Sequence, residues 1–94
     1  AARASAVDAS RKVALNNIRS LAEIYFSQND FSYEGLCDDL QSNLYVSRYI
    51  DSCSAEARRY KVTTQLEGES GYYCVDAVGS SGVIEEITNS VSCQ

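Results

Sequence analysis

The first 28 residues repeat their apolar side chains with the period of an α-helix and contain no Gly or Pro. At about 100° per residue, these side chains form one broad stripe. The stripe consists of Ala14, Leu15, Ile18, Leu21, Ala22, Tyr25 and Phe26. Arg11 points along the same stripe, where burying its charge would be costly. We therefore predict a helix over residues 1–28 that packs from about residue 13, with its first dozen residues projecting beyond the core.

Three apolar residues of this helix, Ala6, Val13 and Ile24, lie on nearly the same side and away from the stripe. Either this side packs against other subunits, or it carries the scattered apolar residues that protein surfaces commonly have. No capping residue precedes the helix. We therefore expect it to be the lower half of a longer helix.

The helical pattern ends at the polar cluster 27–30, and residues 29–59 connect it to strand-like sequence. Within this connection, Leu36, Leu40 and Leu44 recur every four residues. Two acidic residues near its start suit a helix N-terminus. The pattern predicts a short second helix over residues 38–44.

Residues 60–94 contain short strand-like runs separated by glycine-containing turns. Residues 60–66 and 72–77 are predicted strands, and 83–87 is a third, weaker one. Tyr60, Val62, Thr64 and Leu66 alternate onto one face of the first strand. The expected fold is α+β: a single domain, residues 1–94, in which a long N-terminal helix packs on an antiparallel sheet of three to four strands.

Four cysteines, Cys37, Cys53, Cys74 and Cys93, occur in a chain whose single core supplies only a few kcal/mol of stability. The chain has no His and no CxxC spacing, which favours disulfides over zinc. Sequence alone leaves all three pairings open. A 37–53 bond would close the connecting segment, and a 74–93 bond would tether the tail. Disulfides imply an oxidising, extracytoplasmic compartment.

The net charge of −5 argues against a general binder of nucleic acid or anionic membranes. The charge is divided unevenly: residues 1–28 carry 4 − 2 = +2, and residues 29–94 carry 4 − 11 = −7. The basic end either approaches a membrane surface or an acidic neighbour, or is a solvated helix face.

Catalytic chemistry has little support in this sequence. A Ser-His-Asp or Cys-His arrangement needs a His, and the adjacent carboxylates at 38–39 and 85–86 point apart on a helix or strand. A calcium site around Asp76, Ser80 and Glu85 has suitable oxygen ligands, with solvated charges as the alternative interpretation. We expect neither an enzyme nor a bound cofactor.

One basic and aromatic cluster, Arg58, Arg59, Tyr60 and Lys61, lies next to the tyrosines 72–73 predicted on a neighbouring strand. Such a cluster can bind single-stranded nucleic acid by stacking and charge. The acidic remainder of the head and the small size of the cluster oppose this interpretation. Strand-flanking charges beside structural tyrosines are the alternative.

Two motifs of this sequence are distinctive. The predicted helix carries scattered basic residues and ends in aromatic ones, from Arg11-Lys12 through Asn16-Asn17-Ile18-Arg19 and Leu21 to Tyr25-Phe26 and Asn29-Asp30. The second predicted strand and its turn read Tyr72-Tyr73-Cys74-Val75-Asp76-Ala77-x-Gly79. The first motif resembles the lower helix of type IV pilins and pseudopilins. The second is similar to the aromatic-aromatic-Cys-Val-Asp-Ser-x-Gly strand of small bacterial pilins with a cysteine near the C-terminus.

The sequence departs from the family at three points. The helix exit lacks the usual Tyr-Pro, position 77 is Ala rather than Ser, and the apolar N-terminal segment with its basic leader is missing. The resemblance therefore implies the soluble part of a pilin. Its missing apolar helix would anchor the subunit in the inner membrane and later lie in the filament core.

The function that the resemblance implies is structural. The chain would be a subunit of a surface filament, with copies of itself or other pilins as partners. Residues 1–28 would form the helical stalk, and segments 31–59 and 74–93 would set the contacts between neighbours. The alternatives are a minor pilin that binds DNA or a surface ligand, and a small secreted, disulfide-stapled binding or inhibitor module.

Overall fold

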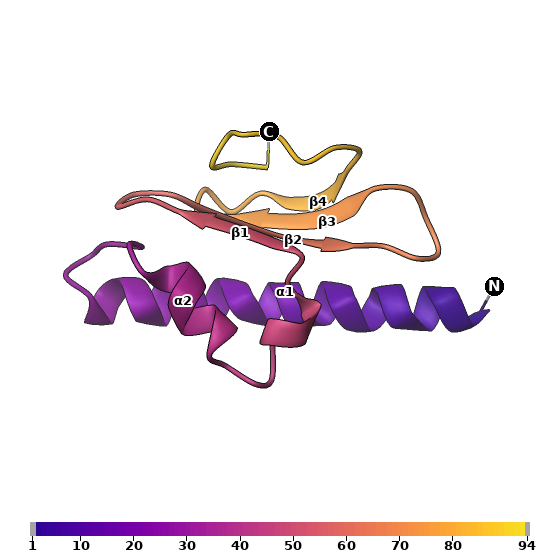
Figure 1. The fold of residues 1–94 in the computed structure, drawn as a ribbon, viewed down its shortest axis with the longest axis horizontal. Coiled ribbons are helices and arrows are strands. Elements are labelled where there is room, and N and C mark those ends of the chain that lie inside the picture. Colours follow the sequence, from indigo (N-terminus) through magenta and orange to yellow (C-terminus); the bar gives the residue numbers. More distant parts are fainter. Residues whose placement is uncertain (1, 94) are drawn as a thin grey trace.

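A long helix lies along one face of a four-stranded antiparallel sheet, and the C-terminal tail covers the other face (Figure 1). The computed structural model describes residues 2–93. The elements are α1 (Ala2–Gln28), α2 (Leu36–Gln41), a 3₁₀ turn η1 (Ser47–Tyr49), β1 (Ser52–Ala55), β2 (Tyr60–Gln65), β3 (Tyr72–Asp76) and β4 (Ser81–Ile84). The strands are arranged in the order β1-β2-β3-β4. The predicted α+β architecture is confirmed.

The predicted stripe of α1 forms the core with the sheet. Leu15 and Ile18 are completely buried, as are Val62 of β2 and Val75 of β3. The other stripe residues are buried or partly buried: Ala14, Leu21, Ala22, Tyr25 and Phe26. Aromatic rings pack together at the end of this core that lies near the C-terminus of α1. The ring centre of Tyr33 lies 4.5 Å from that of Phe26 and 4.9 Å from that of Tyr60.

The prediction that the first dozen residues of α1 project beyond the core is wrong. The Asp8 side chain is buried, and its carboxylate accepts the backbone N–H groups of Glu67 and Gly68, each at 2.7 Å. Arg11 donates to the backbone carbonyl of Gln65. A Cβ on Gly68 would lie 3.0 Å from a carboxylate oxygen of Asp8, so the glycine permits this close approach. The loop between β2 and β3 is thus attached to α1 by polar contacts, which an apolar pattern does not reveal.

The second helix lies earlier than predicted. Helix α2 spans Leu36–Gln41 instead of 38–44; Leu36 and Leu40 are buried, but Leu44 is 85% exposed. The chain leaves the helix at a turn in which the carbonyl of Asn43 accepts the N–H of Val46. This turn takes Leu44 off the helical repeat.

The sheet gains a strand that the sequence analysis did not identify. Strand β1 lies in the connecting segment and pairs antiparallel with β2, with Cys53 opposite Val62. Strand β4 also differs, since it spans Ser81–Ile84 instead of 83–87. The reason is register: β4 pairs with β3 from Ser81 opposite Val75 to Ile84 opposite Tyr72, so its start is set by its neighbour.

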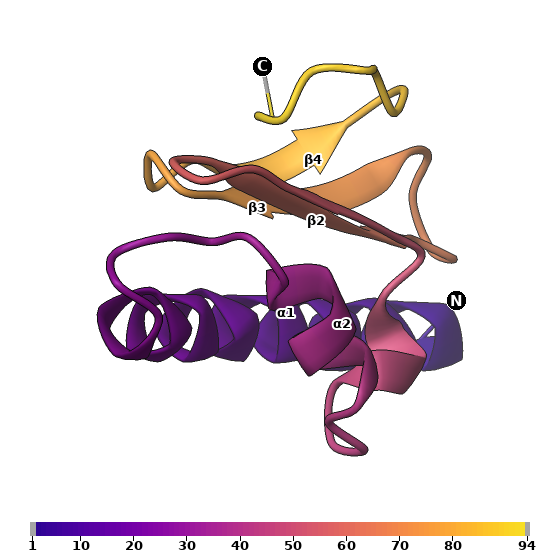
Figure 2. The ribbon, with the colours of Figure 1, turned by 60° about the vertical axis from the view of Figure 1, so that its left-hand side comes forward.

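The two disulfides lie on opposite faces of this sheet. Both expected bonds are present, Cys37–Cys53 and Cys74–Cys93, with Cα atoms 5.8 Å apart in each. Cys53 pairs with Val62 and therefore shares the face that packs on α1, whereas Cys74 pairs with Thr63 and faces the other side. Figure 2 shows the tail on that outer face.

Candidate assembly surfaces

The outward face of α1 contains a strip without charged side chains that runs from Ala6 to Ser27. Six exposed positions in this strip are small or apolar and follow the helical repeat; we call them the outer stripe, which comprises Ala6, Ala9, Val13, Ser20, Ile24 and Ser27. The exposed polar residues Asn16, Asn17 and Glu23 lie beside it. Val13 is 60% exposed and Ile24 53%. The predicted packing residues Ala6, Val13 and Ile24 therefore lie together on an accessible surface. This surface can be covered without removing any charge from water.

The charged residues of α1 point elsewhere. Lys12 forms an ion pair of 2.8 Å with Glu69 in the loop after β2. The carboxylate of Glu23 accepts the hydroxyl of Tyr33 at 2.7 Å. With Asp8 and Arg11 also bound to the loop after β2, most charges of this helix serve contacts within the subunit.

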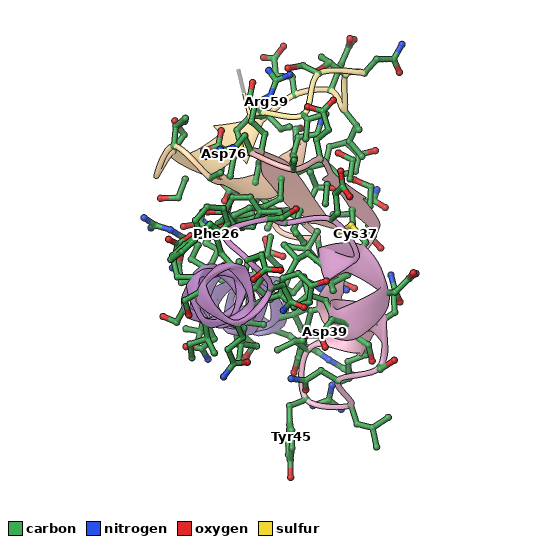
Figure 3. All side chains as sticks on the ribbon, turned by 90° about the vertical axis from the view of Figure 1, so that its left-hand side faces the viewer. Phe26, Cys37, Asp39, Tyr45, Arg59 and Asp76 are labelled. Atoms are coloured by element: carbon green, nitrogen blue, oxygen red, sulfur yellow. A yellow bond between two sulfur atoms is a disulfide. The ribbon has the colours of Figure 1, made fainter. Side chains whose placement is uncertain are left out.

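A tight turn on one side of the outer stripe presents two large apolar side chains to solvent. Leu44 and Tyr45 are 85% and 87% exposed, and we call this pair the knob. Asn43 fixes the turn, because its side-chain oxygen accepts the N–H of Tyr45 at 2.9 Å and its carbonyl accepts that of Ser47 at 2.9 Å. Val46 anchors the turn in the core. Figure 3 shows Tyr45 pointing away from the sheet.

A groove of about 460 Å³ lies on the other side of the outer stripe, between α1 and the turn that joins β3 to β4. We call it the turn-side groove. Arg19, Ser20, Ala77 and Val78 contribute to its lining. Arg19 is half-buried, and its guanidinium has no hydrogen-bond or ion-pair partner in the described chain. A half-buried cation without a partner favours a ligand that can face it.

The carboxylates that also line the turn-side groove, Glu23 and Asp76, have other partners. Glu23 accepts the hydroxyl of Tyr33. Asp76 is buried and accepts the backbone N–H groups of Ser80 at 3.0 Å and Cys93 at 2.8 Å. These contacts give Asp76, a predicted calcium ligand, a structural role: its carboxylate holds the β3–β4 turn and the tail. Residues 2–93 contain no group of three or more His, Cys, Asp and Glu side chains placed for a metal.

The basic and aromatic cluster is not assembled into an exposed patch. Tyr60 is buried against α1, and Lys61 is buried on the outer face, where its amine donates to the carbonyl of Thr88 at 2.8 Å. Strand alternation separates these two side chains. Arg58 and Arg59 stay exposed. A stacking platform for bases needs accessible rings, and Tyr60 cannot supply one.

The groups whose pKa values are shifted are buried or make contacts that stabilise the fold. Burial, aided by the hydrogen bond to Glu23, raises the pKa of Tyr33, and burial raises the pKa of Tyr60 to about 12. Burial lowers the pKa of Lys61. The backbone N–H of Glu67 is the main reason that the pKa of Asp8 is lowered. Each displacement follows from packing or from a contact within the subunit.

Comparisons with models of known families, with curated proteins and with solved structures find no match. The helices within residues 2–93 include none with the length and apolar character of a membrane span. The two disulfides indicate an oxidising, extracytoplasmic environment.

Proposed function

We propose that this chain is a structural subunit of a type IV pilus-like or pseudopilus filament at the cell surface. The outer stripe of α1 carries the proposal. A helix that stays in water normally places charged residues along its outward face, whereas the centre of the outward face of α1 is a strip of small and apolar residues. Packing this stripe against other subunits would bury Val13 and Ile24 without the desolvation of a charge.

The architecture supports the same function. Helix α1 runs the length of the molecule along the sheet, so the outer stripe is a long contact surface (Figure 1). The two disulfides suit a subunit exposed outside the cytoplasm. The cysteine motif that resembles small pilins forms β3 and holds the C-terminal tail through Cys74–Cys93. Partners would be copies of this chain or other pilins, and an apolar segment before α1 would anchor the subunit in the inner membrane.

The test places charge on the outer stripe. The double variant Val13→Glu, Ile24→Glu is produced in the encoding organism with its natural upstream sequence, and surface filaments are sheared off and quantified. We expect at least about a tenfold loss of filaments, because two buried, unpaired carboxylates oppose packing. Thermal unfolding should change little, since both positions are exposed.

The matched control is Ser70→Glu, which adds a charge at an exposed residue of the loop between β2 and β3, outside α1 and outside the segments 31–59 and 74–93 that are expected to contact neighbours. This variant should assemble normally. A wild-type strain without filaments would reject the proposed function. Normal filaments from the double variant would show that the outer stripe is not a packing surface.

A further inference from the structure

The outer stripe separates two features that complement each other. Tyr45 of the knob lies beside Val13 and Asn17, on one side of the stripe. The turn-side groove opens beside Asn16 and Arg19, on the other side. Because the knob and the turn-side groove lie on opposite sides of α1, they can contact each other only between two copies of the chain.

The knob has the properties of a binding anchor. Its turn is fixed by Asn43 and by buried Val46, so little conformational freedom is lost when Tyr45 docks. Tyrosine is also among the residues that contribute most to protein interfaces. Two adjacent apolar side chains with more than four-fifths of their surface exposed gain most from being covered.

The turn-side groove favours an aromatic ring over other ligands. The guanidinium of Arg19 can stack on a ring face. Val78, which is 76% exposed, and Ala77 offer apolar contact, and Ser20 offers a polar group at the groove. An incoming carboxylate would meet the negative charges of Glu23 and Asp76, so its attraction to Arg19 would be offset.

We propose that the knob of one copy docks in the turn-side groove of a second copy, with the ring of Tyr45 against Arg19 and Leu44 against Val78. This inference rests on the proposed function, for which it names a lateral contact between subunits. The contact joins different surfaces of the same chain and is therefore heterologous. Repeating it gives an open filament or a ring instead of a closed dimer.

Two variants divide this contact into its halves. Tyr45→Ser removes the ring of the knob and keeps the groove, whereas Arg19→Ala changes the groove and keeps the knob. Sedimentation equilibrium on the oxidised chain, over a concentration series, measures self-association. Each variant alone should self-associate at least about tenfold more weakly than wild type. Mixed in equal amounts, the two should form heterodimers with wild-type affinity and no larger species. One intact knob then meets one intact groove.

Matched controls separate this contact from general surface effects. Tyr45→Phe keeps the ring and should associate as wild type does, whereas Arg19→Lys keeps the charge without the planar stacking group and should weaken association. Val83→Ser shortens another exposed apolar residue, on β4, and should have no effect. A wild-type chain that stays monomeric at millimolar concentration, or a mixture that forms no heterodimer, would overturn the contact.

A cross-link in filaments distinguishes this inference from the proposed function. Tyr45 is replaced by a photoreactive benzoylphenylalanine, and cross-linked peptides are mapped. Links to residues 16–23 or 77–79 of a neighbour support the contact. Filaments whose links map elsewhere overturn the contact and keep the proposed function. Heterodimers in the mixture but no filaments on cells would overturn the proposed function and keep the contact.

Discussion

The two disulfide-closed segments are similar in length but differ in what holds them on the sheet. Cys37 and Cys53 are 16 residues apart, and Cys74 and Cys93 are 19 apart. The first segment, on the helix side, contains the buried side chains of Leu40 and Val46. In the second, no side chain of residues 85–93 is fully buried, and Ile87 is 41% exposed.

Polar contacts replace apolar packing in the tail. Lys61 donates to the carbonyl of Thr88, and Asp76 accepts the N–H of Cys93. Each such contact contributes only about 0.5–3 kcal/mol. The Cys74–Cys93 bond therefore holds a segment that burial alone would not order, whereas Cys37–Cys53 reinforces a segment that is already part of the core. A disulfide thus orders the chain in the tail but only adds stability in the packed segment.

The largest expected effect tests the packed segment. Leu40→Ala removes a buried side chain of α2 and should lower the free energy of unfolding by about 2–5 kcal/mol. Leu44→Ala in the same segment and Ile87→Ala in the tail remove exposed or half-exposed side chains and should each cost less than about 1 kcal/mol. Urea unfolding under non-reducing conditions measures all three. Similar losses for Leu40 and Ile87 would remove the contrast between the segments.

The next effect comes from the disulfides themselves. Replacing either cysteine pair by serines opens a loop of this size, at a cost of about 3 kcal/mol in the chain-entropy model. The local outcome should differ between the pairs. Without Cys37–Cys53, amides of α2 should stay protected from hydrogen exchange, because Leu36 and Leu40 still pack.

Without Cys74–Cys93, the amides of residues 85–93 should exchange freely while those of β2 and β3 stay protected. Hydrogen-exchange mass spectrometry resolves both segments in one experiment. A tail that keeps its protection after loss of the bond would show that its polar contacts suffice. Loss of protection in α2 after removal of Cys37–Cys53 would show that this segment also depends on its bond.

Features with a local periodic signal could be predicted from the sequence. The stripe of α1 follows from its period, and the alternation from Tyr60 to Leu66 gave the correct inner face of β2. The sequence left all three disulfide pairings open, and the observed pair was expected because one bond would close the connecting segment and the other would hold the tail. Each of these predictions needed information from only one segment or from the spacing of cysteines.

Features set by distant partners could not be predicted in this way. Ser52–Ala55 has weak strand character and becomes β1 through pairing with β2 and the bond at Cys53. Asp8 is buried by a loop that lies about 60 residues away in the chain. The sequence placed Leu44 on a helical repeat, but a turn fixed by Asn43 exposes it. The knob and the turn-side groove depend on such turns, and both were missed.

Lys61 is a further residue whose environment depends on the tail. Its neighbours Arg58 and Arg59 suggested a basic surface, but alternation turns Lys61 to the outer face, where the tail covers it. Burial lowers its pKa from the ordinary 10.5. Its amine is therefore a sensitive reporter of whether the tail is in place.

The smallest expected effect is a pH dependence at Lys61. Because its pKa is lowered in the fold, the unfolded chain binds more protons than the folded chain between that pKa and 10.5. The free energy of unfolding should therefore rise with pH in this window, and Lys61→Met should remove the rise. Urea unfolding of wild type and Lys61→Met between pH 8 and about 10 measures it as the difference between the two curves, because the raised pKa values of Tyr33 and Tyr60, which lower stability as the pH approaches 10, affect both proteins equally.

Lys12 supplies the control of opposite sign. The hydrogen bond to Glu69 raises the pKa of Lys12, so its contribution is complete below 10.5 and is lost only above its folded pKa. Lys12→Met should therefore leave the slope between pH 8 and 10 unchanged. Parallel curves for wild type and Lys61→Met would mean that the tail leaves the amine in water. The tail would then cover the outer face less closely than its disulfide and its contact with Asp76 indicate.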